Sequence, residues 1–152
     1  MNNNDILRRL RYTFDFSDGK MIELFRLADH TVTRAEVSNW LKKEEHPQHK
    51  SCVDKELAIF LNGLINDKRG KRDEQIKPEK RLTNNIILMK LKIALNLQSE
   101  DIIAILSLVD FNLGKAELSA FFRKPTHKHY KKCQDQVLRN FLHGLQVKTE
   151  SA

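Results

Sequence analysis

The segment CVDKELAIFLNGL at residues 52–64 returns as CQDQVLRNFLHGL at residues 133–145. Shifting the whole sequence by the same 81 positions aligns residues 3–66 with residues 84–147 without a gap. The further identical pairs include Asn3/Asn84, Asn4/Asn85, Ile6/Ile87, Leu7/Leu88, Asp29/Asp110, Glu36/Glu117, His46/His127 and Lys50/Lys131. Identity spread over so long an ungapped alignment indicates an internal duplication. The period exceeds that of common solenoid repeats, so the sequence predicts two copies of one small subdomain.

Both copies carry apolar residues at the three- and four-residue spacing of amphipathic helices. The stretches are 6–14, 21–28, 33–41 and 57–64 in the first copy, and 87–95, 102–109, 118–122 and 138–145 in the second. No segment keeps the period-two alternation expected of strands. The predicted fold is therefore all-α: two tandem four-helix repeats, each with a helix-turn-helix-like core, packed as a pseudo-twofold pair.

Polar residues stand where helix caps are expected. We expect Asn3 or Asn4 to cap the first helix of copy one, and Thr83 or Asn84 to cap its counterpart. The sequence TRAE at 33–36 has the spacing of a capping box, which predicts the start of the third helix.

Two glycines, Gly63 and Gly144, fall inside the fourth helices, where glycine costs about 1 kcal/mol relative to alanine. Their equivalent positions predict a close helix crossing in each copy.

A charged stretch, GKRDEQIKPEKR at residues 70–81, separates the copies and contains the helix-discouraging Pro78. The predicted organisation is a first repeat at 1–69, a charged linker at 70–82, a second repeat at 83–147 and a tail at 148–152.

Residues 21–47, MIELFRLADHTVTRAEVSNWLKKEEHP, resemble the helix-turn-helix of phage-repressor-type DNA-binding domains. In such domains the capped helix enters the major groove. Its outward side chains are therefore the predicted nucleic-acid contacts: Arg34, Ser38, Asn39, Lys42, Lys43 and, in the second copy, Ser119. Two features depart from the pattern: Asp29 and Asp110 occupy the turn in place of glycine, and Glu36 and Glu117 bring negative charge near any phosphate. The alternative is a compact bundle in which the third helix packs against the other copy.

The loop after the third helix of copy two, RKPTHKHYKK at 123–132, holds five cations and no acid. These cations, Arg123, Lys124, Lys128, Lys131 and Lys132, complete the predicted nucleic-acid contacts. The counterpart KKEEHPQHKS at 42–51 contains two glutamates, so the second copy is expected to bind a polyanion more strongly. The chain as a whole carries 27 Lys and Arg against 20 Asp and Glu, a net charge of +7. A solvated basic loop without a partner is the alternative interpretation.

Histidine, cysteine and aspartate recur in HPQHKSCVD at 46–54 and in HKHYKKCQD at 127–135. Of the histidines, only His46 and His127 occupy equivalent positions, which argues against a metal site built twice. Each aspartate stands where the fourth helix begins and is expected in its cap or first turn. Each cysteine is expected to be a small buried group. No catalytic residue, metal or cofactor is therefore predicted, and the chain is not expected to be an enzyme. A metal or thiol enzyme that uses Cys52 or Cys133 is the third interpretation, which bound metal or fast alkylation of these thiols would indicate.

The repeated pattern N-N-x-I-L…C-x-D-x-x-L-x-x-F-L-x-G-L resembles the YehS-like family of bacterial proteins, a tandem domain of unknown function. The resemblance covers nearly the whole chain and implies an all-helical cytoplasmic protein, with no activity to carry over. The absence of an export signal and of any long apolar segment agrees with a cytoplasmic protein that contacts no membrane. The leading hypothesis is binding to duplex DNA or structured RNA. The alternative is a protein-interaction or regulatory adaptor; the sequence makes no prediction of oligomeric state.

Overall fold

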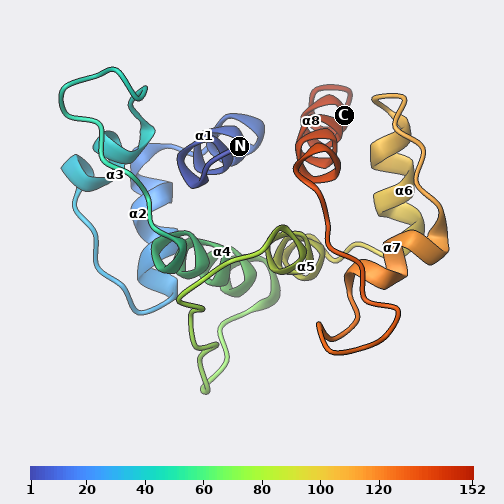
Figure 1. The fold of residues 1–152 in the computed structure, drawn as a ribbon. Helices are drawn as coiled ribbons and strands as arrows, with labels where there is room; N and C mark the ends of the chain where they lie inside the picture. Colours follow the sequence, from blue (N-terminus) through green and yellow to red (C-terminus); the bar gives the residue numbers. More distant parts are fainter. The chain divides into compact units, whose positions relative to one another are not determined.

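The computed structural model describes residues 1–152, which form eight α-helices and no strand. The chain divides into two compact units, Met1–Leu82 and Thr83–Ala152. Each unit contains four helices (Figure 1), so the prediction of two tandem four-helix repeats is confirmed. None of the helices combines the length and the apolar character needed to cross a membrane.

Unit 1 consists of α1 (Asn3–Phe14), α2 (Asp18–Leu27), α3 (Arg34–Leu41) and α4 (Asp54–Arg69). Unit 2 consists of α5 (Asn84–Ala94), α6 (Ser99–Ser107), α7 (Lys115–Phe121) and α8 (Asp135–Glu150). In unit 1, α2 packs against both α3 and α4, while α1 contacts the same two helices. In unit 2, α6 packs against α7 and α8, and α5 contacts α8.

The helix starts agree only partly with the predicted caps. Thr83 accepts a hydrogen bond from the Ile86 N–H, and the predicted capping box at 33–36 is present. The prediction for α1 was wrong: its N-cap is Asn2, whose side chain accepts from the Asp5 N–H. The following two asparagines are available for other contacts because Asn2 takes this role.

The turns between the first three helices use a left-handed residue at equivalent places in both units. These residues are Asp15, Asp29, Asn96 and Asp110, with φ between 53° and 59°. Aspartate and asparagine tolerate this conformation better than other residues with a β-carbon. The turn before α3 therefore reaches the backbone geometry that glycine often supplies, which explains how the sequence manages without one.

The core of unit 1 contains a cluster of three aromatic rings from three helices, with one stacked and one tilted pair. The ring centroid of Phe25 lies 5.3 Å from that of Trp40 and 5.5 Å from that of Phe60, and all three side chains are fully buried. Aromatic pairs at these separations add about 0.5–1.5 kcal/mol to the burial of their area. This cluster fixes α2, α3 and α4 relative to one another.

Both glycines lie at close helix crossings, as predicted. A β-carbon on Gly63 would lie 1.7 Å from the carbonyl oxygen of Leu24, on α2. A β-carbon on Gly144 would lie 2.3 Å from the carbonyl oxygen of Ile105, on α6. No side chain fits at either position, because the obstacle is the backbone of the neighbouring helix.

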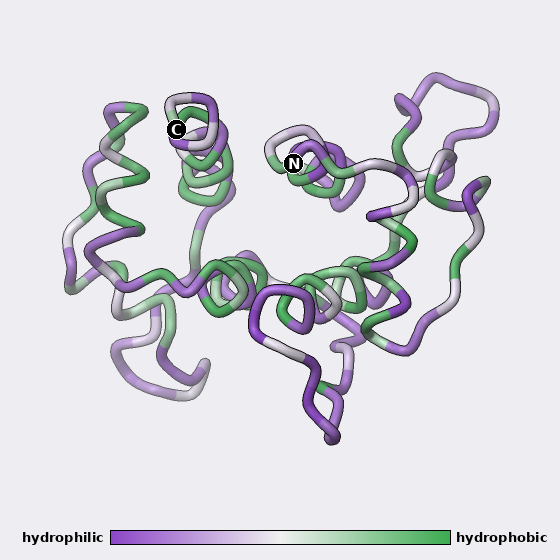
Figure 2. Tube along the Cα trace, turned by 180° about the vertical axis from the view of Figure 1, so that it is seen from behind, coloured by the Kyte–Doolittle hydropathy of each residue, from purple (hydrophilic) through white to green (hydrophobic).

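The segment 70–82 lies within unit 1 and is fixed to it by hydrogen bonds. The Asn66 side chain donates to the Gln75 side chain at 2.9 Å, and the Leu82 N–H donates to the Asp54 carboxylate at 2.8 Å. Figure 2 shows the segment as largely hydrophilic, which agrees with its exposure. At the other end of the chain, α8 continues to Glu150, so the residues predicted as a tail from 148 begin in a helix.

Candidate functional site

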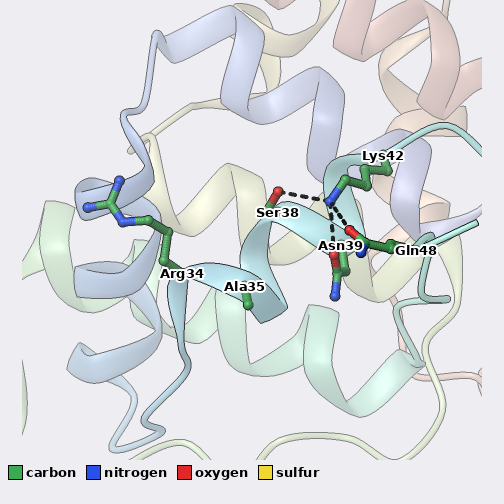
Figure 3. A pocket seen from close by; sticks show the side chains of 6 residues that line it. All are labelled: Arg34, Ala35, Ser38, Asn39, Lys42 and Gln48. Carbon is green, nitrogen blue, oxygen red and sulfur yellow. Dashed lines mark hydrogen bonds between the residues drawn. The ribbon is translucent and has the colours of Figure 1, made fainter. Parts of the chain in front are cut away.

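The outward face of α3 and the loop that follows it line an open pocket of about 600 Å³. We call it the α3 pocket; its lining residues are Arg34, Ala35, Ser38, Asn39, Lys42 and Gln48. Figure 3 shows the six side chains, five from α3 and its end and one from the loop. Four of the predicted contact residues thus share one surface, whereas Lys43 is exposed and lies outside the pocket lining.

The ammonium group of Lys42 is the centre of a hydrogen-bond network in this pocket. Its Nζ lies 3.0 Å from Asn39 Oδ1, 3.1 Å from Gln48 Oε1 and 3.4 Å from Ser38 Oγ (Figure 3). An ammonium has three protons to donate, so these three acceptors occupy all of them. Lys42 is a predicted nucleic-acid contact. In the structure its ammonium group also orients the side-chain amides of Asn39 and Gln48.

The C-terminal end of α3 is held by contacts that only unit 1 possesses. The carbonyl oxygen of Lys42 accepts from Arg8 Nη1 at 3.0 Å and lies 2.8 Å from His49 Nδ1. A carbonyl can only accept, so Nδ1 of His49 carries the proton. The corresponding positions of unit 2 hold Met89 and Tyr130, so the guanidinium and imidazole donors of unit 1 have no counterpart there.

A buried asparagine closes the loop after the third helix in each unit. Asn4 donates from Nδ2 to the carbonyl oxygens of Trp40 and Lys50, at 2.9 and 2.8 Å, and its Oδ1 accepts from the Cys52 N–H at 2.9 Å. We call this arrangement the asparagine bridge. It joins the first helix to both ends of the loop, and only 3% of Asn4 is exposed.

The asparagine bridge recurs in unit 2 with nearly the same distances. Asn85 donates to the carbonyl oxygens of Phe121 and Lys131 at 3.0 and 2.8 Å, and accepts from the Cys133 N–H at 2.9 Å. Its neighbour Asn84 donates to the Cys133 carbonyl oxygen at 3.1 Å. The repeated asparagine pair therefore serves the loop and not the helix cap.

The histidines, cysteines and aspartates of the repeated motif have structural roles in this loop. His46 Nδ1 accepts from the Gln48 N–H, and His127 Nδ1 accepts from the His129 N–H, each at 3.0 Å. As predicted, Asp54 and Asp135 lie in the first turns of α4 and α8. The hydrogen bond from the Asn84 side chain holds the pKa of the Asp135 carboxyl below its ordinary value.

The two thiols lie in surroundings that oppose their ionisation. Cys52 and Cys133 are buried, as predicted, and burial raises the pKa of the first to about 12 and of the second to about 11. The carboxylate of Glu56 adds to the effect at Cys52. A nucleophilic thiol needs the opposite shift. Nowhere in the chain do three His, Cys, Asp or Glu side chains converge as the ligands of a metal would.

In unit 2 the predicted contacts form an exposed basic loop, residues 123–132. Arg123, Lys124, Lys128, Lys131 and Lys132 are all exposed, and so is Ser119 on α7. Arg123 Nη1 lies 3.3 Å from His127 Nε2. Since Nδ1 of His127 accepts a hydrogen bond from the His129 N–H, the ring proton lies on Nε2, which therefore cannot accept from the guanidinium. Arg123 is therefore not held by this neighbour.

The glutamates that the sequence placed near any phosphate have partners of their own. Glu36 accepts from the Thr33 N–H at 3.0 Å and completes the capping box of α3. Glu117 lies 3.1 Å from Lys131 Nζ in an exposed ion pair. The charge of Lys131 is thereby shared with Glu117, and Lys132 contributes to the lowered pKa of the Asp135 carboxyl.

Sequence reasoning missed Gln48, the one pocket residue that the loop contributes. It stands between two histidines in a segment without helical spacing, and nothing in its neighbourhood indicates that it returns to α3. The backbone contact that brings it there is the hydrogen bond from the Lys50 N–H to the Asn39 carbonyl oxygen at 3.0 Å.

Comparison with known proteins agrees with the two repeats. A family model described as protein of unknown function (DUF1456) matches residues 3–70 and, a second time, residues 84–150. The chain is 41% identical over 147 residues to "Uncharacterized protein YehS" of Escherichia coli, and the alignment covers 95% of this chain and 94% of that protein. No solved structure matches.

Proposed function

The chain belongs to the DUF1456 family of proteins of unknown function, and we propose from its own geometry that it binds duplex DNA. The observation that carries the proposal is the exposed basic loop of unit 2, which presents five cations within ten residues. Cations clustered in this way attract phosphates and release the counterions of the duplex.

The second support is the order of α2, a short turn and α3, the segment whose sequence resembles a helix-turn-helix. The turn takes the left-handed conformation at Asp29, and α3 keeps Val37 and Trp40 in the core while Arg34 and Ala35 are exposed. In helix-turn-helix proteins the second helix of the pair presents its outward face to the major groove. Small exposed residues such as Ala35 permit a close approach of the helix to base edges.

The adaptor alternative is favoured if the outward face of the third helix is buried, because no surface is then left for DNA. Within their own units, Ala35 on α3 and Ala116 on α7 are exposed, and Ala120 is half-buried. DNA binding is therefore the function that the surface favours.

The test is fluorescence anisotropy of labelled duplex DNA, single-stranded DNA and hairpin RNA across a salt series. We expect saturable binding to the duplex that weakens linearly with the logarithm of salt concentration. The double variant Arg123→Ala with Lys128→Ala is expected to bind more weakly, with a salt slope shallower by about two.

A matched control removes the same charge elsewhere: Lys77→Ala with Lys80→Ala, both exposed in the segment 70–82. This variant is expected to retain the wild-type affinity and slope. Equal losses in both double variants would show that only net charge matters, and no binding at low salt would refute the proposal.

A further inference from the structure

We infer that the α3 pocket selects guanine over adenine in the major groove, an inference that rests on the proposed function. The basis is the orientation of two amides by Lys42. Lysine can donate but cannot accept, so the atoms of Asn39 and Gln48 that face its Nζ at 3.0 and 3.1 Å are the amide oxygens.

The consequence is a surface made of donors. Because both amide oxygens face Lys42, the side-chain nitrogens of Asn39 and Gln48 are the amide atoms that point away from it. In Figure 3 the Asn39 nitrogen lies on the side of the amide away from Lys42. Arg34 adds further donors at the other end of the pocket, where 71% of its side chain is exposed.

Adenine and guanine present different hydrogen-bonding groups in the major groove. Adenine is read by an amide that gives one hydrogen bond to N7 and accepts one from N6, so it needs the oxygen as well as the nitrogen. Guanine offers N7 and O6, which are both acceptors. An amide whose oxygen faces Lys42 turns its nitrogen toward the opposite side, where that nitrogen can donate to an acceptor of guanine. Its oxygen keeps a second lone pair but points toward the ammonium, so the amide would have to rotate away from Lys42 to present both atoms to adenine.

Unit 2 has no equivalent of this arrangement. The positions of Asn39 and Gln48 are occupied there by Ala120 and His129, and Arg123 replaces Lys42. The effect of amide orientation therefore belongs to unit 1 alone, while the basic loop of unit 2 supplies contacts to phosphate.

The experiment is selection from a randomised duplex library with the wild type, Lys42→Met and Lys55→Met. Both substitutions remove one positive charge from unit 1, and Lys55 is exposed on α4 outside the pocket lining. We expect the wild type to prefer guanine over adenine about tenfold or more at one position of the selected site. Lys55→Met should keep that preference, whereas Lys42→Met should reduce it to about twofold or less because the amides become free to rotate.

A second measurement tests the amide orientation without DNA. In NMR spectra of the free protein, the side-chain amide resonances of Asn39 and Gln48 should shift in Lys42→Met and remain in place in Lys55→Met. Unshifted resonances would overturn the inference. So would duplex binding with the same selected site in Lys42→Met, which would leave the proposed function intact. Failure of every variant and of the wild type to retain any duplex would refute the proposed function and this inference together.

Discussion

Replacing Asn85 by alanine should destabilise unit 2 by about 3–4 kcal/mol. The substitution removes three hydrogen bonds of 2.8–3.0 Å, each with a net contribution of about 1 kcal/mol. It also leaves the carbonyl oxygens of Phe121 and Lys131 and the Cys133 N–H without their partner beside a residue that is only 5% exposed. A loss of this size is a large share of the 5–15 kcal/mol that stabilises a typical domain. Urea unfolding followed by circular dichroism measures it.

Two further variants separate hydrogen bonding from volume. Asn85→Asp keeps the size and the acceptor for the Cys133 N–H but removes the donor to both carbonyl oxygens, so it should cost at least as much as alanine. Asn84→Ala removes contacts in a half-exposed position where water can replace them, and should cost about 1 kcal/mol or less. The reasoning is refuted if Asn85→Ala is no more harmful than Asn84→Ala, or if Asn85→Asp is harmless.

Three other predictions concern the core. Gly63→Ala should destabilise unit 1 by about 3 kcal/mol or more in urea unfolding, whereas Gly19→Ala, in a helix with open space around it, should be neutral or stabilising by up to about 1 kcal/mol. Trp40→Phe should cost only about 1 kcal/mol in the same assay, because the buried Nε1–H has no acceptor and the second copy already uses phenylalanine there. Because burial raises the thiol pKa values of Cys52 and Cys133 to about 12 and about 11, the unfolded chain loses these protons first as the pH rises above 9.0. The double variant to alanine should therefore lose less stability than the wild type between pH 9 and pH 11.

Each of these predictions has a clear contrary result. Equal stability of the two glycine variants would mean that the helix crossing can widen at no cost. A loss of 3 kcal/mol or more in Trp40→Phe would mean that the indole contributes more than ring volume, since losses of that size are typical of truncation to alanine. Parallel pH profiles of the wild type and the double cysteine variant would contradict the raised thiol pKa values.

The helices and their duplication could be predicted because both are local signals. Apolar spacing within about ten residues identifies a helix, and the same spacing at the equivalent positions of the second copy supports each assignment. Gly63 and Gly144 were informative for the same reason: glycine at the same place in two fourth helices indicates a packing requirement. The structure places both against the backbone of a neighbouring helix.

The asparagine pair shows where local reasoning fails. A polar residue beside a helix start is ordinarily a cap, which is why the sequence predicts that role for Asn3 or Asn4. The partners of Asn4 are backbone groups 36, 46 and 48 residues away in the sequence. Only the folded chain brings these groups to it, so no spacing near the helix start could indicate the asparagine bridge.

The α3 pocket shows the same limit for a candidate site. Helical spacing correctly turned Ser38, Asn39 and Lys42 outward, but it treated each side chain as independent. The network around Lys42 depends on Gln48, which arrives through a loop whose shape depends in turn on the asparagine bridge. The charges of a surface could thus be predicted, whereas the direction in which its amides point could not.

The asparagine bridge also protects one backbone amide in each unit from hydrogen exchange with solvent. The N–H groups of Cys52 and Cys133 lie in loops, yet each donates to a side chain of the unit's first helix. Such an amide can exchange its hydrogen with solvent only when the first turn of that helix, which carries the asparagine, separates from the loop. Exchange at these two amides therefore measures, in the intact chain, how often the first helix of each unit releases its loop.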